Sequence, residues 1–253
     1  MMKTLKDIYY TDKNDPMQSL DLYLPDTESF SLLVFFHGGG ITAGDKRGDG
    51  EMLSKYLTDR GVALISANYR MYPSAKYPDF LCDAASAVAW AFNNIGKYGK
   101  CDKIFVGGSS AGGYISQMLC FDPRWLGEHG IDCASIAGYI HDAGQPTAHF
   151  NVLKFSGIDS RRIIIDETAP LYHVGMLDHY APMLIIYSDN DMENRPEQTR
   201  LLISTLNHFR YDMNKIEVTV KHGKHCHYCF ATDADGQSTF ARMIYPFIEK
   251  YSN

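Results

Sequence analysis

The sequence of 253 residues lacks long apolar runs and has little cysteine. No run approaches the roughly 20 apolar residues that a membrane-spanning helix needs, so we expect no membrane partner. Residues 1–15 contain no apolar core of the kind that marks a signal peptide. The six cysteines are too sparse for a disulfide scaffold, and reduced thiols are typical of cytoplasmic proteins. These absences predict a cytoplasmic protein.

Basic residues are also in short supply. Lys and Arg number 24 against 30 Asp and Glu, which leaves a net charge of −6. A nucleic-acid binder normally presents a basic surface, so no nucleic-acid partner is expected. The composition is otherwise that of a globular protein, with 45% hydrophobic and 21% charged residues. Because no repeat or linker divides the chain, we expect a single domain over residues 1–253.

Short apolar runs alternate with segments of helical periodicity along most of the chain. This alternation predicts an α/β fold in which a mostly parallel sheet is covered by helices on both faces. Helical spacing of apolar residues follows Pro78 and Pro196 and recurs from Phe240 to the end of the chain. The runs with strand composition are residues 31–36, 62–67, 103–108, 135–140, 183–188 and, with the alternation of a strand nearer an edge, 216–221.

Two segments depart from this alternation. Residues 7–10 and 19–25 are apolar runs separated by a polar stretch, which predicts an N-terminal antiparallel pair leading into the sheet. Residues 141–180 show no clear periodicity and are rich in His, Pro and Gly. Because a long irregular stretch in a compact domain is commonly functional, we expect residues 141–180 to form a cap-like or substrate-side loop insertion.

The segment "FVGGSSAGGY" at residues 105–114 carries the sharpest chemical signal. It holds a Gly-x-Ser-x-Gly pattern between a predicted strand and a predicted helix. A nucleophilic serine at such a junction lies on a tight, strained turn, so the residues two positions away must be small. The helix that follows helps to stabilise negative charge nearby. Register selects Ser110, because the window centred on Ser109 ends in Ala111 rather than in glycine.

A glycine run, "HGGG" at residues 37–40, follows the first buried strand. Attack on an ester carbonyl creates an oxyanion, and preorganised N–H groups can stabilise it by about 3–4 kcal/mol. Glycine lets the backbone approach a substrate closely. The N–H groups of Gly39, Gly40 and Ala111 are therefore the expected oxyanion hole. We interpret His37 as a structural hydrogen-bonding residue rather than a base.

Together, "HGGG" and "GGSSAGG", with "ISANYR" at residues 65–70 between them, resemble the α/β-hydrolase superfamily. The most similar branch is that of the esterases related to hormone-sensitive lipase and the small feruloyl and acetyl esterases. The resemblance covers nearly the whole chain, from "SLDLYLP" to the last helix. It implies an eight-stranded sheet, a serine–acid–histidine triad in that chain order, and no metal or organic cofactor.

The order of the triad directs attention to the residues after the predicted strand at 183–188. Asp191 lies about three residues past that strand, where the resemblance places the acid, and Asp189 is the alternative. An aspartate in this place would hold the imidazole in one tautomer and stabilise the imidazolium. A solvated acidic loop is the remaining interpretation.

The segment "KHGKHCHYCF" at residues 221–230 holds the histidine candidates. A structural zinc site needs four ligands in tetrahedral geometry, and no second Cys-x-x-Cys or His pair lies elsewhere in the sequence. A redox Cys-x-x-Cys is expected at the start of a helix in a thioredoxin-like unit, which this strand pattern does not match. We therefore predict no metal. The resemblance implies a Gly-containing turn just before the histidine, and His225 follows "HGK", so His225 is the predicted triad base and His227 is the alternative. Cys226 and Cys229 are expected to be small buried apolar residues.

Three further residues lie in segments expected on the catalytic side of the sheet: Gln145, His149 and Arg195. They are candidate substrate-binding residues, and polar side chains that merely stabilise their loops are the alternative. Arg195 could pair with a substrate carboxylate or with its neighbour Glu193.

The sequence thus predicts a serine hydrolase of short-chain or carbohydrate-linked carboxylic esters, with Ser110, Asp191 and His225 as its triad. Its expected partner is a small-molecule ester. An amide hydrolase, either a peptidase or an arylformamidase, would use the same triad, and a catalytically silent binding protein of this fold is a third interpretation. The oligomeric state stays open, although an exposed final strand or helix could support a homodimer.

Overall fold

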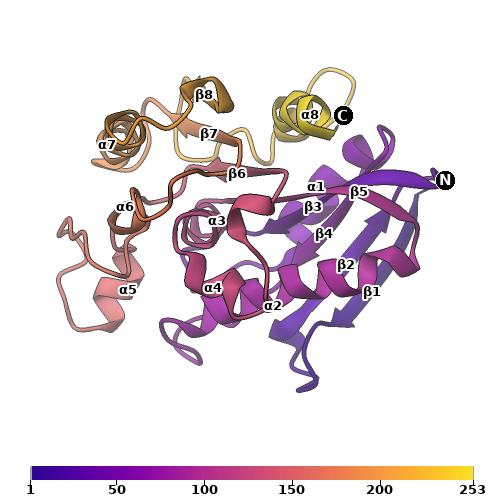
Figure 1. Cartoon of the computed structure of the whole chain (residues 1–253), viewed down its shortest axis with the longest axis horizontal. Coiled ribbons are helices and arrows are strands. Elements are labelled where there is room, and N and C mark those ends of the chain that lie inside the picture. The colour runs from indigo at the N-terminus through magenta and orange to yellow at the C-terminus, as the bar shows by residue number, and fades with distance from the viewer. Residues whose placement is uncertain (1, 253) are drawn as a thin grey trace.

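The computed structural model describes residues 2–252, which form an eight-stranded sheet between two layers of helices (Figure 1). The strand order is β1-β2-β4-β3-β5-β6-β7-β8. β2 is antiparallel to both of its neighbours, whereas every pair from β4 to β8 is parallel. The strands are β1 Lys3–Tyr9, β2 Ser19–Leu24, β3 Ser29–Phe36, β4 Val62–Ala67, β5 Lys100–Ser109, β6 Gly138–Asp142, β7 Met183–Ser188 and β8 Ile216–Lys221.

The helices divide the apolar interior into two clusters, because α1 and α8 pack on one face of the sheet and α2, α3 and α7 on the other. Within residues 2–252 no helix has both the length and the apolar character needed to cross a bilayer. The α-helices are α1 Lys46–Thr58, α2 Asp79–Asn94, α3 Ala111–Phe121, α4 Pro123–Gly127, α5 Phe150–Phe155, α6 Pro170–His173, α7 Arg195–His208 and α8 Thr239–Ser252. Short 3-10 turns are η1 Pro16–Gln18, η2 Ile95–Lys97, η3 Cys133–Ser135 and η4 Met213–Lys215.

This architecture confirms the predicted fold class, including the antiparallel pair at the N-terminus. One predicted strand is displaced. The strand expected at residues 135–140 is β6, which starts and ends later. Asp132 accepts a hydrogen bond from the N–H of Ala134 and begins the turn η3, so the chain enters the sheet only after that turn. The last residues of β6, His141 and Asp142, fall in the segment expected to be irregular.

The connection between β6 and β7 is the longest in the chain, and it contains the short helices α5 and α6. It is packed against α3 rather than standing apart from the sheet: the Tyr114 hydroxyl donates to the Thr168 carbonyl at 2.6 Å. Because α3 follows the strand end that carries Ser110, this packing places the connection beside the candidate site.

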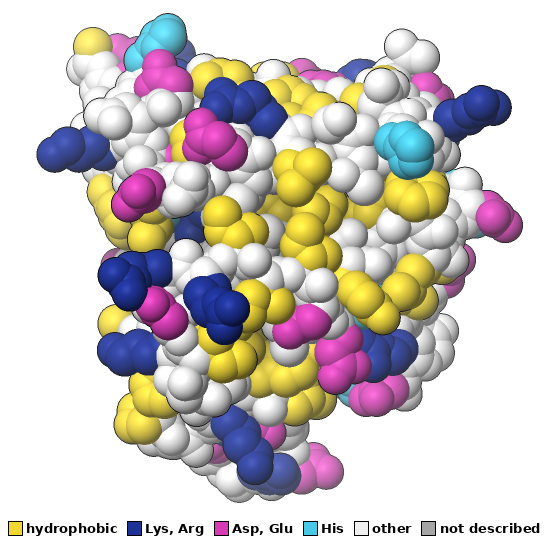
Figure 2. Space-filling view, turned by 90° about the vertical axis from the view of Figure 1, so that its left-hand side faces the viewer, with side chains coloured by type: hydrophobic (Ala, Val, Ile, Leu, Met, Phe, Trp, Pro, Cys, Tyr) yellow, Lys and Arg dark blue, Asp and Glu magenta, His cyan; other side chains and the backbone are white. Residues whose placement is uncertain are grey.

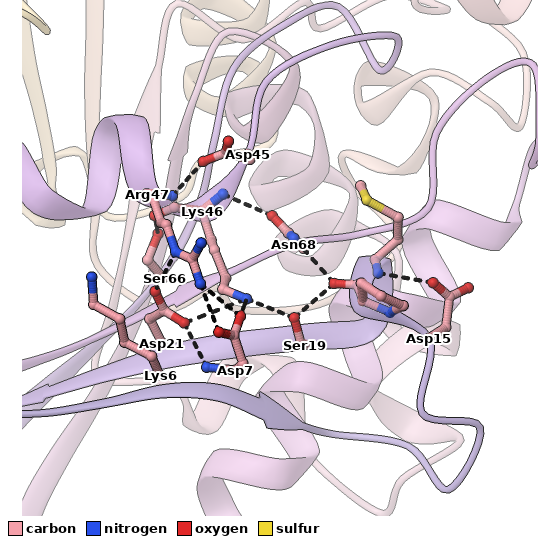
Figure 3. Close-up of polar contacts among 12 residues, drawn as sticks. Lys6, Asp7, Asp15, Ser19, Asp21, Asp45, Lys46, Arg47, Ser66 and Asn68 are labelled. Atoms are coloured by element: carbon pink, nitrogen blue, oxygen red, sulfur yellow. Dashed lines mark hydrogen bonds and ion pairs between the residues drawn. The ribbon is translucent and has the colours of Figure 1, made fainter.

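A buried lysine joins the N-terminal strands to the start of α1 (Figure 3). Lys46 is 3% exposed, and its ammonium lies 2.7 Å from Oδ1 of Asp7 and 3.4 Å from Oδ1 of Asp21. The ammonium also donates to the Ser19 hydroxyl at 2.6 Å, and the Lys46 amide donates to the Asn68 side chain at 2.7 Å. These contacts hold the end of the glycine loop, which leads directly into α1, against the sheet.

Replacing this lysine should cost stability. Lys46→Met removes the buried ammonium next to the fully buried carboxylate of Asp21, which then keeps only the half-exposed Arg47 as a cation, at 3.4 Å. We expect the free energy of unfolding in urea to fall by about 3 kcal/mol, the range measured when one member of a buried ion pair is removed. The matched control is Lys55→Met, which removes an exposed pair with Asp59 in the same helix and should change the stability little. Equal effects of the two substitutions would contradict the prediction.

Candidate active site

Ser110 lies on the sharp turn between β5 and α3. Its backbone φ of 55° and ψ of −109° belong to a region that residues other than glycine rarely adopt. Close packing maintains the turn: a Cβ on Gly108 would collide with the backbone of Gly112, and one on Gly112 would collide with the carbonyl of Phe36. Because only glycine fits at both positions, the two glycines of the sequence motif allow the start of α3 to lie directly against β3.

The structure brings Ser110, His225 and Asp191 into one hydrogen-bonded line. The Ser110 hydroxyl lies 2.8 Å from Nε2 of His225, and Nδ1 of the same ring lies 2.5 Å from Oδ1 of Asp191. The three residues follow β5, β8 and β7, whose carboxyl ends share one edge of the sheet. In this geometry an imidazole can take the serine proton while the carboxylate orients the ring and stabilises its charge.

The environment of His225 favours its protonated form. Burial lowers the pKa of the imidazole, but the hydrogen bonds to Asp191 and Cys226 outweigh burial and raise the pKa to about 9. Asp191 is itself enclosed, and burial would raise its pKa, yet the hydrogen bond and charge of His225 hold the pKa below the ordinary value. Asp142 is a further charged group near the ring. The pair is therefore an ionised aspartate next to a basic imidazole.

The alternative residues of the sequence analysis lie elsewhere. His227 is held by its own loop, with Nδ1 at 2.7 Å from the carbonyl of Lys224. Asp189 forms a separate, exposed pair with Nδ1 of His222. Neither His227 nor Asp189 approaches Ser110 within hydrogen-bonding distance among the described residues. Of the three histidines in the segment, His225 is the one that faces the serine.

The glycine loop between β3 and α1 lies beside the serine, since Gly38 and Gly39 line the same cavity as Ser110. Gly39 and Gly40 have φ values of 113° and 64°, which glycine adopts readily. Within residues 2–252, neither N–H group donates to another protein group, whereas the N–H of Gly38 donates to Asp49 at 3.1 Å. Ala111 is the first residue of α3, where helix N–H groups have no acceptor inside the helix. Among the described residues, the N–H groups of Gly39, Gly40 and Ala111 thus have no protein acceptor.

His37 stabilises this loop from beneath. Its ring is 1% exposed and stacks on Tyr69 with 4.5 Å between the ring centroids. Nδ1 lies 2.7 Å from the carbonyl of Gly38, and the Tyr69 hydroxyl donates to the carbonyl of His37 at 2.8 Å. Burial lowers the pKa of His37 to about 4, so the ring stays neutral and acts as a hydrogen-bond donor. This is the structural role that the sequence indicated.

Sequence reasoning missed Asp142, a buried carboxyl at the end of β6. Its backbone carbonyl accepts from the N–H of Ser110 at 2.8 Å, and its side chain accepts from the Tyr228 hydroxyl and, at 3.3 Å, from the Cys229 thiol. Burial raises the pKa of Asp142 to about 6. The available signal is a polar residue at the end of a buried strand. The sequence pattern hides it, because residues 141–180 lack periodicity and Asp142 falls among them.

The two cysteines of the segment take part in this network, which corrects the expectation that they are merely apolar. Cys226 is half-buried, and its thiol also lies 3.9 Å from a carboxylate oxygen of Asp142. The ligand atoms of Asp142, Cys226 and Cys229 lie within 4.8 Å of one another, so these are the side chains with which a metal ion could be held. Their contacts are explained as thiol and hydroxyl donors that satisfy a buried carboxyl.

A cavity of about 310 Å³ opens directly at Ser110 and His225. Its lining is mostly apolar, and the ring of Phe230, 64% exposed, forms part of its wall. Asp45 and Asp49 are its acidic members. A small, largely uncharged group therefore fits on this side of the serine.

Of the three candidate substrate-binding residues, two line a second cavity of about 280 Å³. Gln145 and Arg195 face this cavity, whereas His149 lines neither of the two. His149 is 2% exposed, accepts from the N–H of Asn151 at 3.2 Å and stacks on Phe150, and burial lowers its pKa well below the ordinary value. Its place is in the protein interior, where it caps α5, which corrects its assignment as a substrate contact.

Comparison with known proteins adds relatives that hydrolyse esters. Residues 20–126 match the family model described as BD-FAE. The probable carboxylic ester hydrolase LipM of Mycobacterium tuberculosis is 37% identical over 99 residues, which cover 39% of this chain and 23% of LipM. Esterase LipC of the same organism is 28% identical over 217 residues, which cover 76% of this chain and 53% of LipC. The chain thus matches about half or less of the length of these relatives.

Solved structures share the fold across the whole chain. A truncated carbohydrate esterase from gut microbiota superimposes with a TM-score of 0.77 at 17% identity and covers 99% of this chain and 96% of its own. A butyrate-bound thermophilic esterase from Thermogutta terrifontis gives a TM-score of 0.76 at 20% identity, with coverage of 98% and 94%. The chain therefore has the fold of these esterases, and part of its sequence is similar to carboxylic ester hydrolases.

Proposed function

We propose that this protein is a serine hydrolase that cleaves carboxylic esters with a short acyl chain or a carbohydrate alcohol. The observation that carries the proposal is the continuous hydrogen-bonded line from Ser110 through His225 to Asp191, next to three N–H groups with no other acceptor. A nucleophile, a base and an oxyanion site are the parts that acyl transfer requires.

In the proposed reaction, Ser110 attacks the ester carbonyl while His225 takes the proton of the hydroxyl. The charge that develops on the carbonyl oxygen is held by the N–H groups of Gly39, Gly40 and Ala111. The resulting imidazolium is stabilised by Asp191 and then protonates the leaving alcohol. Water, activated by the same histidine, attacks the acyl-enzyme and releases the acid, which restores Ser110.

Several observations favour esters over the alternatives. The curated relatives are named as ester hydrolases, and among the structural neighbours one is a carbohydrate esterase and another holds butyrate. The cavity of about 310 Å³ at Ser110 is of a size for a short acyl or sugar group. No observation favours amide cleavage. A catalytically silent binding protein would not need the hydrogen bonds that join Ser110, His225 and Asp191. The six cysteines are unpaired, which supports a cytoplasmic setting for the reaction.

Replacing the nucleophile tests the proposed mechanism. Ser110→Ala should lower kcat for 4-nitrophenyl acetate by about 10⁴-fold or more, because the variant cannot form the acyl-enzyme. The melting temperature should not fall, since the hydroxyl is not part of the core. Ser109→Ala is the matched control and should keep most of the activity. Turnover retained in Ser110→Ala would refute the mechanism, and faster cleavage of an aryl formamide than of the ester would favour an amide hydrolase.

A second prediction separates the two neighbouring histidines. His225→Ala should reduce kcat by several orders of magnitude, because it removes the group that takes the serine proton. His227→Ala should leave kcat within a few-fold of the wild type, since that ring contacts the carbonyl of Lys224 instead. Steady-state kinetics on one neutral ester suffices for both. A greater loss in His227→Ala would show that the loop places the other imidazole at Ser110.

The pH dependence follows from the raised pKa of His225. The imidazole accepts a proton only in its neutral form, so kcat/KM for a neutral ester should rise with pH toward about 9 and fall about tenfold per unit well below it. Asp191→Asn removes a carboxylate that raises this pKa. In that variant the inflection should move to lower pH while the maximal rate drops. The profile from about pH 5 to 10 measures both effects, and an inflection that stays in place would count against the assignment.

A further inference from the structure

Arg195 is a buried cation without an anionic partner. Arg195 is the first residue of α7, yet it is only 4% exposed. The guanidinium donates to the carbonyl of Ala143 at 2.6 Å and to Oε1 of Gln145 at 3.1 Å, both of which are neutral acceptors. Within residues 2–252 no carboxylate forms an ion pair with it, and Glu193, the acidic neighbour in sequence, makes no such contact.

An arrangement of this kind has a cost. Moving a charge out of water is unfavourable unless an opposite charge compensates for it. Burial lowers the pKa of Arg195, and the charge of Asp191, which lies beyond ion-pair distance, offsets this only in part. A guanidinium still keeps its charge in a protein and carries five N–H donors, of which three are directed at the carbonyl of Ala143, Oε1 of Gln145 and, at 4.0 Å, the sulfur of Met192. The remaining donors are not sealed in the interior, because Arg195 lines the cavity of about 280 Å³.

The lining of this cavity is basic, but the basic residues are confined to the cavity and its rim. Arg161 and Arg162 also line it, and Glu193 is its single acidic member. Arg161 forms an ion pair with Asp159 and Arg162 is exposed to solvent, so Arg195 is the buried cation at the cavity wall that has no ion pair among the described residues. Figure 2 shows the side of the molecule with α5, α6 and α7, where dark blue and magenta side chains are interspersed. That face offers no continuous basic surface to a polyanion, which favours one small anionic group.

The cavity adjoins the candidate active site and shares no lining residue with the apolar cavity. Phe150 lines it, and the edge of its ring is 3.4 Å from where a Cβ of Gly40 would lie. The next residue, Asn151, donates to the carbonyl of Gly40 at 2.6 Å. Met192, which follows the acid Asp191, forms another part of the wall. The cavity therefore lies between the glycine loop and the acid loop.

We propose that the cavity at Arg195 is a subsite for a carboxylate carried by the ester substrate, an inference that rests on the proposed esterase function. A carboxylate accepts charge-assisted hydrogen bonds from a guanidinium, and Nε–H and one Nη1–H of Arg195 have no protein acceptor among residues 2–252. Asp45 and Asp49 repel an anion from the apolar cavity at Ser110. The substrate carboxylate is therefore favoured only in the cavity at Arg195. The substrate class is an ester with one uncharged end and one carboxylate within reach of Ser110.

Two pairs of substrates test where the carboxylate belongs. On the acyl side, mono-4-nitrophenyl glutarate is compared with 4-nitrophenyl pentanoate; on the alcohol side, 3-acetoxybenzoate is compared with 3-acetoxybenzamide. The wild type should show kcat/KM at least about tenfold higher for the anionic member of one pair, as expected for a charge-assisted hydrogen bond. The pair that shows the preference assigns the carboxylate to that side. Ratios at or below one in both pairs would overturn the subsite.

Variants at α7 then locate the effect. In Arg195→Met the preference for the anionic ester should fall by about tenfold, mainly through KM, and Arg195→Lys should restore part of it. Arg200→Met is the matched control, because Arg200 is exposed on the same helix and pairs with Glu197. An unchanged preference in a folded Arg195→Met, or an equal loss in Arg200→Met, would overturn the assignment.

A measurement on the wild type alone covers the case in which Arg195→Met does not fold. Glutarate should inhibit hydrolysis of 4-nitrophenyl pentanoate competitively and more strongly than neutral glutaramide does, and added salt should weaken this inhibition. Equal inhibition by the two compounds would overturn the subsite. If the wild type cleaves none of the neutral esters, the proposed esterase function fails; if it cleaves them without any preference for anions, only the subsite fails.

Discussion

The site depends on one close approach, that of the first turn of α3 to strand β3. At Gly112 the helix backbone lies so near the carbonyl of Phe36 that no side chain fits between them. The chain must therefore reverse direction within a single residue, and Ser110 takes up the positive φ that this requires. The N–H of Ser110 is held by the carbonyl of Asp142, so the neighbouring strand β6 helps to maintain the strain.

Around this turn the protein buries polar groups and satisfies most of them. His37 is neutral and bonded to the loop that it supports, and Asp142 receives a hydroxyl and two thiols. Asp191 and His225 form an ion pair. Arg195 departs from this pattern, since its acceptors are neutral and its free donors face a cavity. Buried charge that the protein itself leaves unpaired is a reason to look for its partner in the substrate.

Much of the architecture could be predicted because it follows from local patterns. Buried parallel strands are continuous apolar runs, and the helices between them keep the spacing of one apolar face, so strands such as 62–67 and 183–188 were found at their true bounds. The strand near residue 138 was misplaced because its apolar letters begin before the Asp132 turn ends. The polar residues that close this strand, including Asp142, looked like loop because burial by neighbouring elements leaves no mark in local sequence.

By itself, the sequence determined that a serine on a glycine-rich turn, an acid after one strand and a histidine after the next would gather at one edge of a parallel sheet. The serine follows from its glycine motif, the places of the acid and the histidine follow from the resemblance to α/β-hydrolases, and their meeting at one edge follows from the direction of the strands. The choice between His225 and His227 was left to the tertiary structure, because both occupy the same short segment. There the positive φ of Cys226 and the contact of His227 with the Lys224 carbonyl turn the two rings in different directions. Whether Arg195 pairs with Glu193 was decided in the same way, since the path of the chain, rather than spacing along it, sets which groups meet.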